Sequence, residues 1–466
     1  MPTSAPTAEQ LAAALNQLES RLADRVVGPQ DAAWNEARRA WNLAVDQRPG
    51  AVATPESADD VVAVVEIARE HGLRVAPQGT GHSAAPRASL EGSVLLDTSR
   101  MNRVEIDPER RAARLQAGAR WGDVAGAAAE HGLAGLSGSA PGICVTGYAL
   151  GGGAGWMIRR YGLAANSIRA AEVVTADARI VRADAGSEPD LFWALRGGGG
   201  SFGVVTALEL ELFPIRELYA GVLFWPQERA AEVLGAWREW TADLPEEMSS
   251  LGRLLNVPPL EEIPEPLRGR SFVVVEAAWL GDEAGGSEQL APLRELDPEM
   301  DTFAMIPPTG LAALHMDPPE PVPGAGDGVL LSDLPADGID ALLGAAGPGT
   351  GSPLVSIEVR HLGGAAGRAD PENGARAAID AAYILFAVGT AIGPEMMQAV
   401  ERRIDEVEAA LRRWDAGRFL TFTERPVDPA RMFADEAYRR LREIKAKFDP
   451  HNVIQANHEI SPAELS

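Results

Sequence analysis

Residues 145–156 read VTGYALGGGAGW, and this glycine-rich stretch decides the fold prediction. Its three consecutive glycines, 151–153, cost conformational entropy when the chain folds. Such a run is favourable only where a ligand or another backbone segment approaches closely. Two further glycine segments flank it in the sequence, GTGHS at 79–83 and GGGGSFG at 197–203. Three clusters in one region predict a large, flat ligand that is held mainly by backbone groups.

The segment GTGHS follows an apolar stretch at 73–77 that is typical of a strand. Small residues allow successive backbone N–H groups to converge on an anion without obstruction by side chains. His82 is unusual within such a turn, because its ring must project toward whatever the amides hold. The turn and the histidine together predict a site for an anionic ligand.

The segment 198–203 matches the G-x-G-x-x-G pattern of dinucleotide-binding folds. That pattern functions only when a strand precedes it and a helix follows it, since the pyrophosphate must meet a helix N-terminus. Here the preceding 189–196 (PDLFWALR) is helix-like, and the following 204–212 (VVTALELEL) alternates as a strand does. The reversed order excludes a Rossmann site.

Composition excludes several classes of function. The 466 residues carry a formal net charge of −25, which argues against nucleic acid or a membrane surface as partner. The single cysteine, Cys144, excludes intrachain disulfides and cysteine metal clusters, and no metal site is expected. Lysine occurs only at 445 and 447, so P-loop and Schiff-base chemistry are excluded. The sequence shows neither a signal peptide nor a membrane span, and a cytoplasmic location is expected.

The pattern of predicted strands and helices changes near residue 215, which is the predicted domain boundary. Before it, the patterns predict helices over 11–22 and 57–72, a strand at 51–55 and a hairpin over 103–118. Beyond it, predicted strands at 220–225, 272–280, 303–306, 354–361 and 382–388 alternate with predicted helices at 227–242, 286–296, 337–345 and 394–414. The Pro/Gly-rich stretch 307–328 is predicted to be a long loop.

Several segments in order resemble the berberine-bridge-enzyme-like FAD-linked oxidases of the vanillyl-alcohol-oxidase/PCMH superfamily: GTGHS (79–83), AGARWGDV (117–124), YALGGGAGWMIRRYGLAANSI (148–168), VVTAD (173–177), PDLFWALRGGGGSFGVVTALELEL (189–212), RHLGGA (360–365) and AKFDPHNVIQANHEI (446–460). The resemblance implies an α+β fold. A PCMH-type FAD-binding domain would comprise 1–215 and a C-terminal return, 416–466. Residues 216–415 would form a substrate domain with an antiparallel sheet covered by helices.

The resemblance also implies the FAD site. The family joins the histidine of this turn to the 8α-methyl of the flavin, a role that falls on His82. A second link, from cysteine, would fall on Ala140, so we expect a single covalent bond and a buried Cys144. The cofactor-binding residues implied are Gln78, Gly79, Thr80, Gly81, His82, Ser83, Ala140, Val145, Gly147, Gly152, Gly155, Val204, Val205 and Asn457.

The chemistry implied is removal of hydride from a C–H next to O or N of a small metabolite, with electrons passed to O2 to give H2O2. Ile143 stands where valine is associated with oxidases, so a dehydrogenase with another electron acceptor is an alternative. The usual positions of the catalytic base are apolar here, at Ala84, Phe386 and Phe419, which raises a redox-silent flavin-binding protein as a further alternative. We expect a monomer or homodimer.

The strand that contains SIEVRH offers the remaining catalytic candidates. His361, with Tyr383 from a neighbouring strand, is predicted to face the substrate. Ser356, Glu358 and Arg360 share the opposite face of that strand, because side chains alternate along it. A Glu–Arg pair on a strand usually marks a solvated face, and we expect that here.

Overall fold

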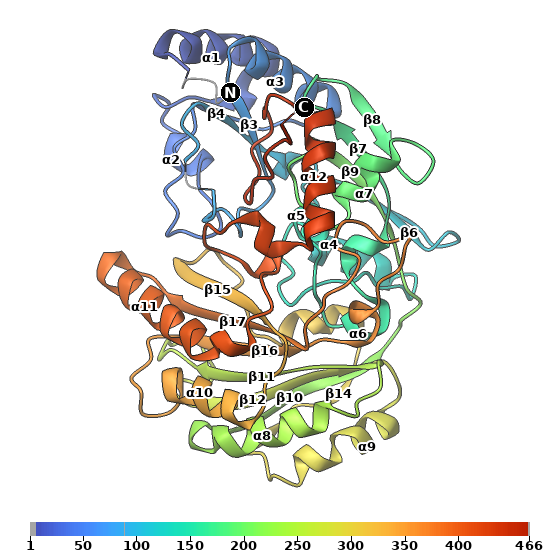
Figure 1. Ribbon diagram of the computed structural model, residues 1–466, viewed down its shortest axis with the longest axis vertical. Coiled ribbons are helices and arrows are strands. Elements are labelled where there is room, and N and C mark those ends of the chain that lie inside the picture. Colours follow the sequence, from blue (N-terminus) through green and yellow to red (C-terminus); the bar gives the residue numbers. More distant parts are fainter. Residues whose placement is uncertain (1–5, 88, 465–466) are drawn as a thin grey trace.

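The computed structural model describes residues 6–87 and 89–464. Its secondary structure forms three sheets with helices on their faces, which makes it an α+β fold as predicted. Two sheets lie in the upper half of Figure 1 and the third in the lower half, with both chain ends at the top. The chain thus passes from the upper half to the lower half and back again.

The first sheet has four strands in the order β1-β2-β4-β3, and the last three are parallel. Helices α1 and α3 cover it, and their apolar stripes meet Val75 and Val94 in one core. The side chain of Ser57 caps α3 by accepting a hydrogen bond from the backbone N–H of Asp60. The element bounds are α1 Ala8–Leu22, β1 Val26–Val27, α2 Trp34–Ala37, β2 Ala51–Ala53, α3 Ala58–Glu70, β3 Arg74–Gln78 and β4 Ser93–Asp97.

The second sheet is antiparallel, in the order β5-β6-β9-β7-β8. The predicted hairpin over 103–118 is present as β5 and β6, and the segment 198–203 lies between α7 and β9. A helix therefore precedes that segment and a strand follows it, which confirms the order that excluded a Rossmann site. The bounds are β5 Val104–Asp107, β6 Ala112–Gln116, α4 Trp121–Ala129, α5 Val145–Leu150, α6 Ile158–Tyr161, β7 Ile168–Val174, β8 Ile180–Ala183, α7 Pro189–Leu195 and β9 Val204–Glu211.

The third sheet has eight strands, in the order β13-β10-β12-β11-β16-β17-β15, with β14 beside β10. Helices α8, α10 and α11 pack one of its faces into a single core, and they lie below or beside the sheet in Figure 1. The other face lies toward the first two sheets. The bounds are β10 Leu218–Pro226, α8 Ala230–Thr241, β11 Met248–Asn256, β12 Ser271–Trp279, α9 Glu283–Arg294, β13 Met300–Asp301, β14 Ala304–Ile306, β15 Gly324–Leu331, α10 Ala336–Ala346, β16 Ser356–His361, β17 Tyr383–Thr390 and α11 Gly393–Leu411.

All strands and helices predicted beyond residue 215 are present, but the sequence did not predict β11, β13 or β15. The predicted loop over 307–328 is wrong in part. Its first third contains a 3-10 helix, Pro308–Ala313, and its last five residues begin β15. Glycine at 324, 326 and 328 hides the strand, because three of the first five residues have no side chain to show an alternating pattern.

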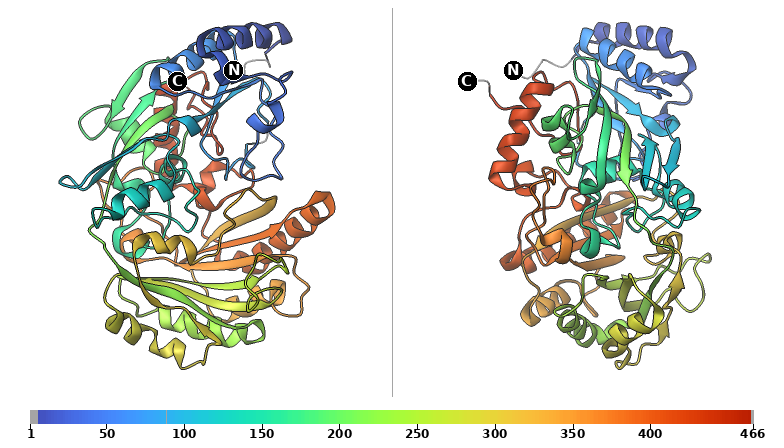
Figure 2. Two further views of the ribbon diagram at one scale, coloured as in Figure 1. Left: turned by 180° about the vertical axis from the view of Figure 1, so that it is seen from behind. Right: turned by 90° about the vertical axis from the view of Figure 1, so that its right-hand side faces the viewer.

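The C-terminal segment returns to the first two sheets. Helix α12, Asp435–Phe448, packs on α7, and Figure 2 shows it beside the second sheet. Ile454 then forms a β-bridge to Val75 at the edge of the first sheet. Lys445 is fully buried there and donates to Asp449 Oδ2 (2.6 Å), Ser201 O (2.7 Å) and Ile454 O (3.3 Å). This return brings the C-terminal residues against the glycine-rich segments.

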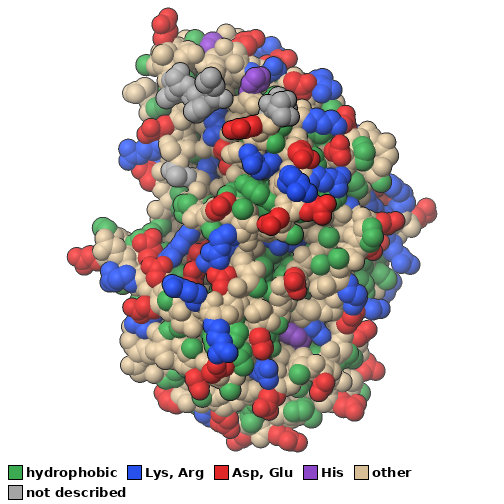
Figure 3. Space-filling view, in the orientation of Figure 1, with side chains coloured by type: hydrophobic (Ala, Val, Ile, Leu, Met, Phe, Trp, Pro, Cys, Tyr) green, Lys and Arg blue, Asp and Glu red, His purple; other side chains and the backbone are tan. Residues whose placement is uncertain are grey.

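Within residues 6–87 and 89–464, no helix is both long and apolar enough to cross a bilayer. Figure 3 shows acidic and basic side chains interspersed over the face seen in Figure 1.

Candidate active site

The GTGHS turn begins where β3 ends, at Gln78. Gly81 has φ +78°, and a Cβ there would lie 3.0 Å from Ala40. The ring of His82 stacks on Trp41, with centroids 4.2 Å apart, and its Nδ1 lies 2.7 Å from Thr80 Oγ1. Burial lowers the pKa of His82 to about 4. The imidazole is therefore neutral at pH 7, the form in which a ring nitrogen has a free lone pair.

Cys144 lies directly behind this turn. A Cβ on Gly79 would be 2.5 Å from its Sγ, and its thiol donates to Ala117 O (3.0 Å). Burial raises the pKa of the thiol, which keeps it protonated and unreactive. The expectation of a buried Cys144 is confirmed.

The glycines of the second segment have different neighbours. Gly147, on α5, faces open space, since nothing lies within 4 Å of a Cβ built there. Gly152 has φ +111° and is pressed against Phe419, whose Cζ would lie 2.7 Å from a Cβ. A Cβ on Gly155 would collide with Ser137 O at 2.0 Å. Close protein packing thus accounts for Gly152 and Gly155, whereas Gly147 leaves room for a ligand.

The other residues implied for the cofactor lie around these two segments. Gln78 is buried, and its Oε1 accepts from Arg87 Nη2 (3.1 Å), so its side chain is already bound within the protein. Val145, Val204 and Val205 are buried, while Thr80, Ser83, Ala140 and Asn457 are partly exposed. Asn457 follows the β-bridge of Ile454 and so lies in the C-terminal return.

These residues fit a flat cofactor with polar groups. Gly142, Gly147 and Gly200 each leave open space where a side chain would otherwise be. Thr146 Oγ1 and Thr421 Oγ1 are buried and have no hydrogen-bond partner in residues 6–87 and 89–464. Buried hydroxyls are normally hydrogen-bonded, so partners from a bound ligand are expected.

Five charged side chains, four of them buried and Arg360 partly buried, gather on the face of the third sheet that lies toward the glycine segments. Arg253 (β11) donates to Glu276 Oε1 (2.9 Å) on β12, and Arg360 donates to both oxygens of Glu358 (2.8 and 3.1 Å) on β16. His315, from the segment between β14 and β15, lies between the two carboxylates: its Nδ1 is 2.7 Å from Glu276 Oε2 and its Nε2 is 2.8 Å from Glu358 Oε2. We call these five residues the charged network.

The charged network corrects the expectation that Glu358 and Arg360 lie on a solvated face. Glu358 is 2% exposed, because the segment with His315 and the loop with Trp156 cover this face of the sheet. Burial and Arg253 lower the pKa of His315, but Glu276, Glu358 and Asp317 outweigh them and raise it to about 9. Burial raises the pKa of Glu358, but Arg360 and His315 hold it well below its usual range.

Arg253, Glu276 and His315 were not among the residues predicted for the site. A signal for two of them exists: each is a lone charge within an apolar run, LGRLL at 251–255 and VVVEAAW at 273–279. A charged residue at a buried position requires a partner. His315 has no comparable signal, because only the path of its segment through the fold brings it between the two carboxylates.

The predicted catalytic residues His361 and Tyr383 are neighbours, with ring centroids 5.9 Å apart. Tyr383 packs into the core under the helices, and its hydroxyl is 3.3 Å from Thr241 Oγ1. His361 lies 3.1 Å from Arg159 Nη1 and lines a cavity of about 20 Å³ with Gly155, Trp156 and Arg360. Burial and the Arg159 charge lower the pKa of His361 to about 3.

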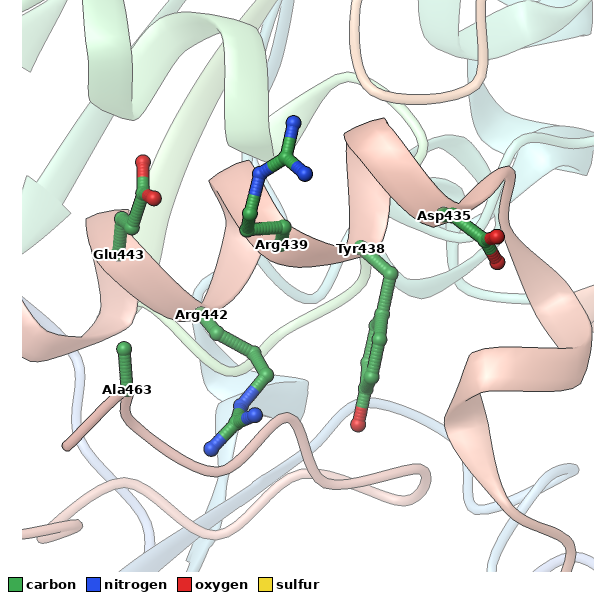
Figure 4. Close-up of a pocket in the computed structure, with 6 residues that line it drawn as sticks. All are labelled: Asp435, Tyr438, Arg439, Arg442, Glu443 and Ala463. Carbon is green, nitrogen blue, oxygen red and sulfur yellow. The ribbon is translucent and has the colours of Figure 1, made fainter.

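A larger hollow, of about 260 Å³, lies away from this region (Figure 4). It is open to solvent and lies between α12 and the C-terminal segment, and Tyr438 and Arg442 extend from the same side of the helix. None of its lining residues belongs to the glycine segments or the charged network, and we assign it no chemical role.

Comparison with known proteins agrees with this geometry. A family model described as an FAD binding domain matches residues 49–184, and a model described as berberine and berberine-like matches 419–461. The first match contains both glycine loops, and the second contains the C-terminal return that packs against them. The fold and site thus define a flavoprotein with an FAD-binding domain. In both regions the chain is thus similar to the berberine-bridge-enzyme-like FAD-linked oxidases.

Individual relatives match over different lengths. (R)-6-hydroxynicotine oxidase of Paenarthrobacter nicotinovorans is 36% identical over 201 residues, which is 43% of this chain and 44% of that protein. An uncharacterized FAD-linked oxidoreductase of Bacillus subtilis, YgaK, is 25% identical over 461 residues, which is 96% of this chain and 99% of that protein. The solved structure of 6-hydroxy-D-nicotine oxidase from Arthrobacter nicotinovorans superposes with a TM-score of 0.82 at 26% identity, covering 94% and 98%.

A further structural relative shares the fold at lower identity. Glucooligosaccharide oxidase from Acremonium strictum gives a TM-score of 0.81 at 22% identity, covering 97% of this chain and 100% of that one. Its FAD is described as 6-S-cysteinyl and 8α-N1-histidyl, and is thus attached at two points.

Proposed function

We propose that this protein is an FAD-dependent oxidoreductase that removes hydride from a C–H next to O or N of a small metabolite. Its flavin would be attached through a single bond to His82. The FAD-binding domain and the named oxidases among its relatives support the class of reaction. The observation that carries the attachment is the neutral, partly exposed imidazole at the end of the glycine turn.

The protein would position the flavin and the substrate and would stabilise developing charge, while the bound flavin would accept the hydride. The turn 79–83 and the loop 145–156 would hold the cofactor. The Phe419–Thr421 segment would close over it, since a Cβ on Gly151 would lie 2.6 Å from Thr421 Cγ2. His361 and Tyr383 stay predictions as catalytic residues; His361 is the one that lines a cavity with the glycine loop.

The attachment is tested by denaturation. After acid precipitation, the yellow colour should remain with wild-type polypeptide and with Cys144→Ala, and it should be released from His82→Ala. Because Ala140 stands at the position of the second link, no cysteinyl adduct is expected. Release of free FAD from the wild-type protein would contradict the proposal for His82.

The electron acceptor is proposed to be O2, with formation of H2O2. Ile143 is partly buried and packs against the core of the second sheet, and a dehydrogenase is the alternative that it motivates. Stopped-flow reoxidation of the reduced enzyme in air decides between them. Rapid peroxide formation supports an oxidase, and slow reoxidation with rapid turnover of a dye acceptor supports a dehydrogenase.

A further inference from the structure

The charged network carries an unbalanced charge. It contains three cations, Arg253, His315 and Arg360, but two carboxylates, Glu276 and Glu358. Both nitrogens of His315 lie within 2.8 Å of a carboxylate oxygen, and these carboxylates raise its pKa to about 9, so the ring is protonated at pH 7. Asp317, whose side chain is 26% exposed, lies 4.0 Å from His315 Nε2 and supplies a third negative charge. The five residues of the network therefore hold one cation more than carboxylates, and Asp317 offsets it from the partly exposed side.

Arg360 is the member of the charged network that reaches the space between the domains. Its Nε and Nη2 bind Glu358, and Nη1 donates to no residue in the part of the chain that the structure describes. The guanidinium lies over Trp156 of the glycine loop (5.9 Å to the ring centroid) and over Phe422 of the C-terminal return (5.2 Å). It therefore touches both regions that match flavoprotein family models, and it lines the small cavity beside Gly155.

Beside this cavity the charged network offers a donor, Arg360 Nη1, but no free acceptor. Both Glu358 oxygens are occupied by Arg360, and Oε2 also by His315. A cationic donor with no acceptor beside it favours a ligand that brings electron-rich oxygen. A protonated amine would instead meet like charge.

We propose, resting on the oxidoreductase function proposed above, that Arg360 binds the oxygen at the reacting carbon of the substrate. The substrate class is then an alcohol or hemiacetal rather than an amine. In the reaction the C–H bond breaks with its electron pair, which goes with the hydrogen to the flavin. The O–H proton leaves to solvent, and a C=O bond forms. Arg360 stabilises the negative charge that develops on the oxygen.

Sulfite tests the charge without knowledge of the substrate. It adds its lone pair to oxidised flavin, so a cation nearby strengthens the adduct, and bleaching of the flavin gives the dissociation constant. We expect Arg360→Met holoenzyme to bind sulfite at least tenfold more weakly than wild type, and Arg360→Lys to stay within about threefold. Arg413→Met is the matched control: this side chain is 77% exposed beside Asp337, and no change is expected.

Equal sulfite affinity in Arg360→Met and wild type would overturn the proposal, as would failure of the wild type to form the adduct. If Arg360→Met does not retain flavin, a second measurement on wild type decides: anaerobic bleaching with a panel of alcohols, neutral sugars and amines. Bleaching by hydroxyl compounds supports the proposal, and bleaching by amines alone overturns it. If nothing in the panel bleaches the flavin, the proposed oxidoreductase function fails, whereas the sulfite result still reports on Arg360.

Discussion

At the scale of single residues, the imidazole of His315 shows how a side chain can be essential without acting as a base. Both of its nitrogens face buried carboxylates, which raise its pKa to about 9, so at pH 7 the protonated ring has no lone pair for a substrate proton. Its carbonyl oxygen also accepts from Arg253 Nη1 (2.8 Å). The residue therefore joins the segment between β14 and β15 to three strands of the third sheet, β11, β12 and β16.

Replacement of His315 by Gln is expected to destabilise the fold by about 3–5 kcal/mol, because two buried carboxylates lose their shared cation. The pKa of His315 is raised from 6.5 to about 9. Its stabilisation is therefore complete below about pH 6.5 and is lost as the pH rises through about 9, to a limit of roughly 3 kcal/mol. Unfolding midpoints of wild type should fall between pH 7 and pH 10, and those of His315→Gln should fall less.

His451→Gln is the control for this measurement, since His451 is exposed just after α12 and should leave both the midpoint and its pH dependence unchanged. The same pH dependence in His315→Gln and wild type would contradict the role given to the imidazolium.

At the scale of elements, the alternation of strands and helices beyond residue 215 could be predicted, because apolar runs and helical periods are local. β11 (MSSLGRLLN) could not, since a glycine and an arginine interrupt its apolar run and hide its burial. The glycine clusters predicted a ligand, but the sequence could not distinguish glycines that face open space from those pressed against protein. That distinction depends on Phe419 and Ser137, which reach the loop from other parts of the fold.

Gly147→Ala uses this distinction. The Cβ meets no atom within 4 Å, and alanine in α5 should stabilise the flavin-free protein by about 0.5–1 kcal/mol. If the open space belongs to FAD, the same methyl group should weaken flavin retention. We expect a higher melting temperature for apoprotein together with a lower flavin-to-protein ratio after purification. A full flavin content would show that the cofactor lies elsewhere.

At the scale of the whole molecule, the two halves are joined by buried cations rather than by apolar packing alone. Arg159, on α6, has no carboxylate partner among the described residues and donates to the backbone carbonyls of Leu244 (2.9 Å), Met248 (2.8 Å) and Leu362, near the ends of the central strands β11 and β16. Lys445, also buried, joins the C-terminal return to the backbone carbonyl of Ser201. Neither contact could be predicted, since each joins segments distant in sequence.

The two lysines make a matched pair for testing the return. Lys445→Met leaves Asp449 buried without its cation and should cost about 3–5 kcal/mol. Lys447 is 58% exposed and lies 3.3 Å from Asp190, so Lys447→Met should change stability by less than about 1 kcal/mol. Denaturant unfolding followed by flavin fluorescence measures both. Similar losses in the two variants would contradict the role of Lys445 in holding the return.

The contrast between these lysines has a practical consequence. Lys445 is sealed within the protein, which leaves Lys447 as the exposed lysine amine of the chain. Amine-reactive dyes or supports should therefore couple at one lysine on α12, apart from the N-terminal amine. Molecules immobilised in this way would share one orientation on a surface, which suits an electrode that takes electrons from the flavin.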